Sequence, residues 1–193
     1  MVAAKLPHRR QVSQLHWGGG TPTFLDSRQL RRCHEILARH FEFTSDAEKA
    51  IEIDPAITTK EQLDTLAGLG FNRISMGVQD FDAKVQEVVG RIQGEKETAD
   101  LVVHARELGF RGVNLDLIYG LPYQTPDTWN DTLGRILSIH PDRMAVFGFA
   151  YVAIAYQLVG VVTRRFSSDE RFALLAAVII ASVMTVFGAV LIG

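Results

Sequence analysis

Gly18-Gly19-Gly20-Thr21-Pro22 follows directly on residues 12–17, an alternating run in which Val12, Leu15 and Trp17 are the apolar members. Three consecutive glycines weaken any helix or strand interior, so they indicate a sharp turn where the backbone approaches another group. A strand, a glycine-rich turn and then a helix are the usual place where α/β proteins bind a small ligand through backbone N–H groups. A tight turn without a ligand is the alternative, and these five residues alone leave both open.

Length and charge limit what the chain can be. It has 193 residues, a formal net charge of −2 and 47% hydrophobic residues, which suits one buried core with room for an appendage. A charge this close to zero gives no electrostatic reason to expect a nucleic acid partner. The single cysteine, Cys33, excludes an internal disulfide and predicts a reducing compartment. One thiolate cannot hold a metal cluster, so we expect Cys33 to be a buried or half-buried structural thiol.

Strand and helix patterns alternate along residues 1–150. Helix starts are indicated by cap signals, Asp26 or Ser27 for one helix and Thr58 or Thr59 for the next, where Glu61 lies at capping-box spacing from Thr58. This alternation is typical of a parallel sheet with helices packed outside it. Continued right-handed crossovers predict a partial (β/α) barrel, with an open doubly wound sheet as the alternative. The expected strands are residues 12–17, 50–54, 73–78, 113–118 and 143–150, and the expected helices are residues 27–40, 59–69, 81–89, 96–108 and 127–139.

Polar or special residues recur where each expected strand ends. Glu52 and Asp116 lie within apolar strands, where an unpaired carboxylate is costly to bury. Either one alone could accept backbone hydrogen bonds or pair with an arginine. Because the carboxyl ends of parallel strands form the active face of α/β proteins, the whole set predicts a shared polar ligand there. The set comprises residues 18–21, Glu52, Asp54, Gln79, Asp80, Asp116, Tyr119, Gly120 and Ala150.

Five stretches in this order resemble one family, the oxygen-independent coproporphyrinogen III oxidases, which are radical S-adenosylmethionine (SAM) enzymes of haem biosynthesis. The resemblance covers residues 1–151. The glycine motif alone is common to many radical SAM proteins, whereas the combination is specific and favours the oxidase over the haem-chaperone relatives. The stretches are HWGGGTPT (16–23), IEIDP (51–55), NRISMGVQDF (72–81), LDLIYGLPYQTP (115–126) and PDRMAVF (141–147).

The resemblance implies two SAM molecules at the strand ends. Gly19 and Glu52 match positions that contact the SAM on the iron–sulfur cluster. Glycine amides can approach a cofactor closely, a carboxylate can accept from ribose hydroxyls or an amino group, and an arginine can clamp a carboxylate. The positions that match those around the second SAM are Gly20, Thr21, Gln79, Arg91, Asp116 and Ala150.

The resemblance also implies a reaction. In this family a [4Fe–4S] cluster cleaves SAM reductively, and the resulting radical starts the oxidative decarboxylation of coproporphyrinogen III to protoporphyrinogen IX. The implied partners are the porphyrinogen substrate and an electron donor for the cluster, and the implied location is the cytoplasm. The protein's task is to place the cofactors and exclude water.

The sequence departs from the family in two places. The family's C-x-x-x-C-x-x-C cluster loop should lie upstream of Met1, and Cys33 cannot replace it, so we expect no metal ligands and no independent catalysis in this chain. After residue 151 the pattern is lost. Residues 152–193 form an apolar tail, and residues 172–193 carry no charge, which predicts a membrane-spanning helix, with a buried soluble helix as the alternative.

Three functions therefore compete. One is an enzyme, a coproporphyrinogen dehydrogenase homologue built on a partial barrel of residues 1–151. The second is a non-catalytic fragment, membrane-tethered or misassembled, that retains part of a SAM site. The third is a membrane or interaction protein in which the barrel is only a remnant. Retained Glu52, Gln79, Arg91 and Asp116 favour descent from a working site, and the apolar tail favours association with a membrane or aggregation.

Overall fold

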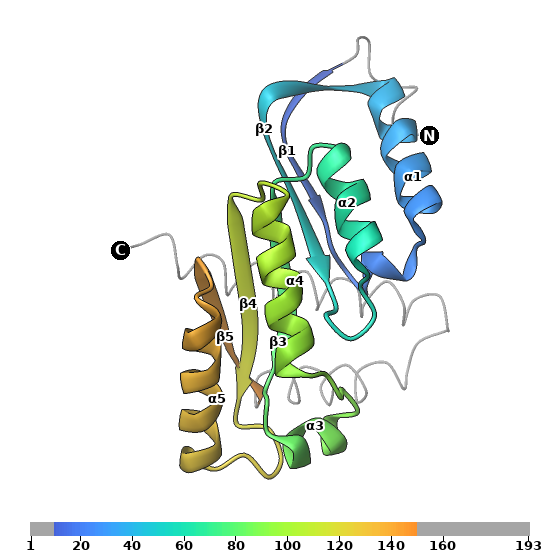
Figure 1. The fold of residues 1–193 in the computed structure, drawn as a ribbon. Coiled ribbons are helices and arrows are strands. Elements are labelled where there is room, and N and C mark those ends of the chain that lie inside the picture. The colour runs from blue at the N-terminus through green and yellow to red at the C-terminus, as the bar shows by residue number, and fades with distance from the viewer. Residues whose placement is uncertain (1–9, 150–193) are drawn as a thin grey trace, which may run out of the picture. The chain divides into compact units, whose positions relative to one another are not determined.

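The computed structural model describes residues 10–149 of the chain, which contain one five-stranded sheet. Its spatial order, β1-β2-β3-β4-β5, is the order along the chain (Figure 1). The pairs β1–β2, β2–β3 and β3–β4 are parallel, so each crossover adds the next strand on the same side. The strands are β1 (Arg10–Trp17), β2 (Phe41–Ile53), β3 (Arg73–Gln79), β4 (Gly112–Tyr119) and β5 (Arg143–Gly148).

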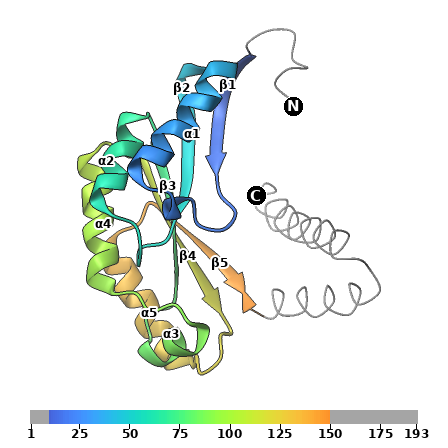
Figure 2. The same cartoon turned by 90° about the vertical axis from the view of Figure 1, so that its right-hand side faces the viewer.

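The crossover helices lie on one face of this sheet, as the two views in Figures 1 and 2 show. A doubly wound sheet needs helices on both faces, so that alternative is wrong for residues 10–149. The partial parallel β/α barrel predicted from the sequence is confirmed. The helices are η2 (Pro22–Phe24), α1 (Ser27–His40), α2 (Lys60–Gly68), α3 (Ala83–Val89), α4 (Glu95–Glu107) and α5 (Pro126–Ile139).

Burial alternates along the central strands, because successive side chains of a strand point to opposite faces. In β3, Ile74, Met76 and Val78 are buried in the core, whereas the residues between them are only partly buried. The same alternation holds in β4, where Val113 and Leu115 are fully buried. The half-buried positions therefore form the face that the described helices leave uncovered.

Helix starts follow capping chemistry, with one change from prediction. Asp26 caps α1 in a reciprocal capping box with Gln29. In α2 the box joins Thr59 to Gln62, so Thr59 is confirmed among the two predicted caps and the Thr58–Glu61 box is wrong. The Thr58 hydroxyl is used elsewhere, since it lies 2.8 Å from the Thr23 hydroxyl and donates to the Asp54 carbonyl at 2.7 Å.

Two further expectations need correction. Strand β2 begins at Phe41, well before the predicted residue 50. After residues 41–43 the alternation is lost in the polar residues 44–46, where the register with β1 also shifts, so the sequence does not indicate one continuous strand. Cys33 is exposed on α1, so the prediction of a buried or half-buried thiol is wrong. It follows Leu30, the fully buried member of that helix, by three residues and is nevertheless exposed.

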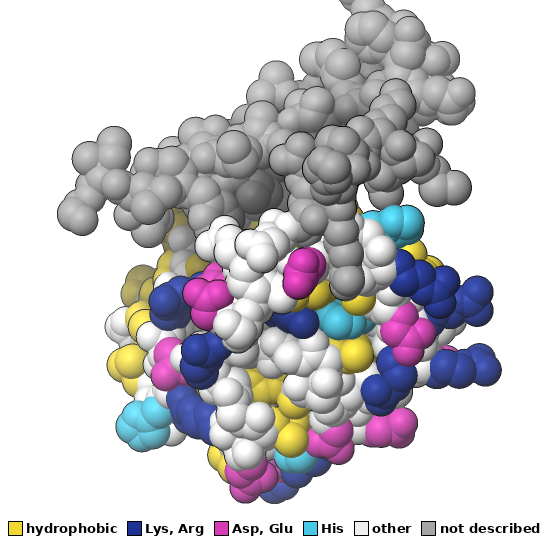
Figure 3. Space-filling view, turned by 90° about the horizontal axis from the view of Figure 1, so that it is seen from above, with side chains coloured by type: hydrophobic (Ala, Val, Ile, Leu, Met, Phe, Trp, Pro, Cys, Tyr) yellow, Lys and Arg dark blue, Asp and Glu magenta, His cyan; other side chains and the backbone are white. Residues whose placement is uncertain are grey.

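Surface charge on the described part is mixed in sign. Seen from the edge where the strands begin, acidic and basic side chains alternate over the surface (Figure 3).

Strand β5 was expected to reach residue 150 and ends at Gly148. The apolar tail at residues 152–193, its proposed membrane helix at residues 172–193 and the domain boundary at residue 151 lie outside the described residues. Within residues 10–149, every helix is too short or too polar to cross a bilayer.

The packed face predicts a clear stability difference between two leucines. Leu115 is fully buried in β4, and Leu137 on α5 is 56% exposed. We expect Leu115→Ala to lower the free energy of unfolding by about 2–5 kcal/mol, because it leaves a cavity. Leu137→Ala should change it by no more than about 0.5 kcal/mol. Urea denaturation followed by circular dichroism measures both, and equal losses would contradict the assigned faces.

Candidate functional site

The glycine turn after β1 lies against the end of β2. Gly19 and Gly20 have φ angles of +80° and +72°, a left-handed conformation that glycine adopts without strain. The Gly19 N–H donates to the Glu52 carboxylate at 3.2 Å. A Cβ at Gly18 would lie 2.6 Å from Glu52 Oε1 and 2.7 Å from His16 Nε2. The predicted close approach is therefore present, and the group that the described turn approaches is the Glu52 carboxylate.

His16 forms an ion pair with Glu52 at the mouth of this turn, with Nε2 and Oε1 3.1 Å apart. The hydrogen bond from His16, helped by the Gly19 N–H, lowers the pKa of Glu52 although burial opposes this. The same hydrogen bond raises the pKa of His16 against its own desolvation. His16 was not predicted as a site residue. Its even position in β1, opposite in parity to the core-facing Leu15 and Trp17, is the signal that could have placed it on the uncovered face.

Asp116 lies on the same uncovered face, in β4. It accepts hydrogen bonds from the Ser75 hydroxyl at 2.7 Å and from the Asn114 amide at 2.5 Å. Burial raises the pKa of Asp116, the two hydrogen bonds partly oppose the rise, and the charge of Glu52 adds to it. The two predicted carboxylates thus have opposite electrostatic environments. Ser75 and Asn114 were not predicted as site residues, although both follow from the alternation of β3 and β4.

Gly77 is the point at which three predicted site residues converge. It pairs with Asp116 in the β3–β4 register. A Cβ at Gly77 would lie 2.9 Å from the Gln79 amide nitrogen and 3.5 Å from the Arg91 guanidinium. The absence of a side chain at Gly77 therefore keeps a polar space between Gln79, Arg91 and Asp116.

Arg91 reaches this space from the segment between α3 and α4. Its Nη2 pairs with Asp54 Oδ2 at 2.7 Å, and the Asp54 side chain is 19% exposed. Asp54 follows β2 directly, so this ion pair joins the end of β2 to the segment that follows α3. Asp54 was predicted as one of the polar residues at the strand ends. Its pairing with Arg91 was not predicted, because 37 positions separate the two residues in the sequence.

Gln79 combines two unusual features. It has a φ angle of +69°, which costs a non-glycine residue free energy and recurs at functional sites. Its amide oxygen is buried and has no hydrogen-bond partner within residues 10–149. A buried acceptor without a donor is rare in folded proteins, so this oxygen fits a donor supplied by a ligand.

The remaining predicted site residues divide into two cases. Thr21 is the half-buried N-cap residue of η2, and its hydroxyl makes no capping hydrogen bond, so it is available at the glycine turn. Ala150 lies outside the described residues. Within residues 10–149, no group of three His, Cys, Asp or Glu side chains is arranged to hold a metal ion. The polar groups at this edge of the sheet are the acceptors of Glu52, Gln79 and Asp116 and the guanidinium of Arg91, which suit a polar organic ligand.

Sequence comparison assigns the class of protein that this fold and site belong to. The profile of the radical SAM superfamily matches residues 1–136, so the chain belongs to the radical SAM superfamily. Among curated proteins, the oxygen-independent coproporphyrinogen III oxidase of Escherichia coli is 51% identical over 143 residues, which are 74% of this chain and 31% of that protein. The corresponding oxidase of Pseudomonas aeruginosa is 46% identical over 154 residues, or 79% of this chain and 34% of that protein. The chain thus spans about a third of the length of these relatives.

Solved structures agree with this assignment. Coproporphyrinogen III oxidase from Escherichia coli superposes with a TM-score of 0.73 at 41% identity, covering 91% of this chain and 41% of that one. The radical SAM methyltransferase TsrM from Kitasatospora setae has a TM-score of 0.58 at 16% identity, covering 70% and 27%. The second likeness supports the fold alone.

The His16–Glu52 pair predicts a pH dependence of stability. The raised pKa of His16 adds stability that is lost as the pH rises through its folded pKa. The lowered pKa of Glu52 adds stability that is lost as the pH falls through its folded pKa. The pair should therefore stabilise the fold most between the ordinary pKa values, 4.5 for Glu52 and 6.5 for His16. With side chains 58% and 43% exposed, the effect is small.

Urea denaturation of His16→Gln against the unmodified chain at several pH values measures this dependence. The difference in the free energy of unfolding should be largest near pH 5.5 to 6 and shrink by pH 8. His40→Gln is the control, because His40 is exposed at the end of α1 and forms no ion pair with the described residues. A difference that is constant across this range would contradict the pairing.

Proposed function

We propose that this chain forms the SAM-binding half-barrel of an oxygen-independent coproporphyrinogen III oxidase. The observation that carries the proposal is the convergence of Gln79, Arg91 and Asp116 on the side-chain-free position Gly77, at the carboxyl end of a radical SAM fold. The names of the relatives support the oxidase as the particular activity. They favour an enzyme over the alternative of a non-catalytic, membrane-tethered fragment.

The first SAM molecule is assigned to Gly19 and Glu52. The Glu52 carboxylate stays ionised more readily than an ordinary glutamate, because its pKa is lowered, so it suits the amino group or ribose hydroxyls of SAM. The Gly19 N–H now donates to Glu52 at 3.2 Å, which fixes the carboxylate close to the turn. His16 restrains the other carboxylate oxygen.

The second SAM molecule is assigned to Gly20, Thr21, Gln79, Arg91, Asp116 and Ala150. Gln79 offers its unpartnered amide oxygen to a donor. Arg91 is anchored by Asp54 through one nitrogen, and its other N–H groups remain suited to a ligand carboxylate. Asp116 adds a second carboxyl group, whose pKa is raised by burial. Amine, carboxylate and hydroxyl groups of SAM each find a complementary residue in this set.

The chemistry proposed for the family needs SAM and a [4Fe–4S] cluster, which together supply a radical that abstracts hydrogen from the substrate. The residues of this chain fit SAM. They do not fit the cluster, because the single cysteine lies exposed on α1 and a cluster needs several thiolates. The proposed role of the described residues is therefore to bind and orient SAM, with a porphyrinogen substrate and an electron donor as partners of the whole enzyme, in the cytoplasm.

Calorimetric titration of SAM into the 193-residue chain tests the proposal with two matched arginines. Arg91 pairs with Asp54 at 2.7 Å, and Arg73 pairs with Glu48 at 2.6 Å, and both lie at half-buried positions. Arg91→Gln should weaken SAM binding about tenfold, because a charge-assisted contact to the ligand is lost. Arg73→Gln should change the affinity by no more than about twofold, because Arg73 lies at the amino end of β3.

Two results would overturn this assignment. If the unmodified chain does not bind SAM, the proposed function fails. If the chain binds SAM and the two arginine variants weaken binding equally, the assignment of Arg91 to the ligand fails.

A further inference from the structure

The backbone at Gln79 is held in a conformation that it would not adopt alone. The Asp80 N–H donates to the Val78 carbonyl at 2.9 Å, which closes a three-residue turn around Gln79. With φ at +69°, this is the rare and strained form of the γ-turn. The pairing register between β3 and β4 also shifts between Gly77 and Gln79. A strained turn persists only when surrounding contacts fix it.

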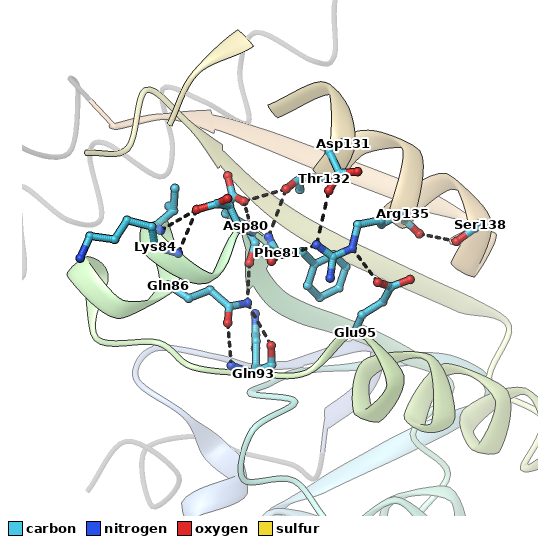
Figure 4. Close-up of polar contacts among 12 residues, drawn as sticks. Asp80, Phe81, Lys84, Gln86, Gln93, Glu95, Asp131, Thr132, Arg135 and Ser138 are labelled. Atoms are coloured by element: carbon cyan, nitrogen blue, oxygen red, sulfur yellow. Dashed lines mark hydrogen bonds and ion pairs between the residues drawn. The ribbon is translucent and has the colours of Figure 1, made fainter. Parts of the chain in front are cut away.

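The Asp80 carboxylate makes some of the contacts that fix this turn. Asp80 is 1% exposed. Its carboxylate accepts from the Thr132 hydroxyl of α5 at 2.7 Å (Figure 4). It also accepts from the Asp82 N–H at 2.7 Å and from the Gln124 amide. The donors in these contacts are neutral, and a buried carboxylate is tolerated only when such donors satisfy it.

Gln86 and Gln93 hold the other side of the turn. The Gln86 amide donates to the Asp80 carbonyl at 2.8 Å and to the Gln93 carbonyl at 2.9 Å (Figure 4). The Gln93 amide donates in turn to the carbonyls of Gly77 and Val78. The carbonyls on both sides of Gln79 are therefore bonded to side chains from outside the strand.

Gln124 extends the contacts of Asp80 to the next strand. Besides Asp80, its amide nitrogen donates to the Ile118 carbonyl at 3.1 Å, and its amide oxygen accepts from the Gly120 N–H at 2.6 Å. Both backbone groups lie where β4 ends, just beyond Asp116. The Asp80 carboxylate thus joins the ends of the two neighbouring strands that carry Gln79 and Asp116.

We propose that Asp80 is a positioning residue that fixes the turn at Gln79 relative to the end of β4, and so sets the spacing of Gln79 and Asp116 around their shared ligand. This inference rests on the proposed function for the identity of that ligand, SAM. Asp80 itself is buried behind the turn and acts through Gln79. It differs from a residue that only stabilises the fold, because its effect on binding should depend on the Gln79 side chain.

The test measures the dissociation constant of SAM for the full chain with Asp80→Asn, Thr132→Val and Thr98→Val. Thr98→Val is the matched control, since Thr98 is also a fully buried helix threonine but donates only to the Gly94 carbonyl in its own helix. Asp80→Asn should weaken binding about tenfold and Thr132→Val about threefold, because a donor at Asp80 is left unsatisfied or lost. Thr98→Val should leave binding within about twofold.

A double-mutant cycle with Gln79→Ala separates positioning from general destabilisation. In the Gln79→Ala background, Asp80→Asn should have no more than about a twofold further effect, because the group that it positions is gone. An undiminished tenfold effect in that background would overturn the inference while leaving the proposed function intact.

Amide resonances supply a readout that does not need SAM. In Asp80→Asn, the amide signals of Gln79 and Gly120 should both move in heteronuclear NMR spectra, and in Thr98→Val both should stay in place. If the unmodified chain fails to bind SAM, the proposed function fails and these resonances still decide whether Asp80 fixes the two strand ends. Unchanged signals in Asp80→Asn would overturn the inference.

Discussion

Each strand of a sheet must divide its side chains between two faces, and in this chain the described helices cover only one of them. The covered face carries the aliphatic core of β3 and β4, with Ile74, Met76 and Leu115 almost fully buried. The uncovered face can therefore carry polar side chains without an apolar layer against them. Polar side chains and core side chains occupy alternate positions of the same strands, so the polar face does not interrupt the packing of the core.

Glu52 and Asp116 show how local donors shift the pKa values of two carboxylates on one face in opposite directions. Glu52 receives a hydrogen bond from His16 and one from the Gly19 N–H, and these outweigh its burial and lower its pKa. Asp116 receives only neutral donors from Ser75 and Asn114, so burial dominates and raises its pKa. Environments that push the pKa values of paired carboxylates apart commonly assign them distinct functions. A cationic group bound beside Asp116 would oppose the effect of burial and favour its ionised form.

Much of this arrangement could be predicted from the sequence because it depends on local patterns. Alternation in residues 73–78 and 113–118, together with the glycine run, predicted both the parallel sheet and the edge where the polar residues meet. The pairing of Asp54 with Arg91 could not be predicted, because it joins two loops distant in sequence. The start of β2 at Phe41 was missed for a related reason, since the polar residues 44–46 interrupt the alternation and only pairing with β1 shows that the strand begins before them. Exposure of Cys33 likewise depends on how α1 is rotated against the core.

The placement of the helices also explains why the polar site is braced by loops. Since the described helices pack on the opposite face, they cannot contact the side chains of the uncovered face directly. Rigidity at Gln79 must then come from the connections at the carboxyl edge, where Asp80 bonds to Thr132 of α5 and Gln93 bonds to the backbone of β3. Arg135 adds a further brace, donating to Glu95 at 2.6 Å and to the Phe81 carbonyl at 3.1 Å. The helices of the covered face thus connect to the uncovered face through polar groups at the strand ends, which makes those groups the link between the core and the uncovered face.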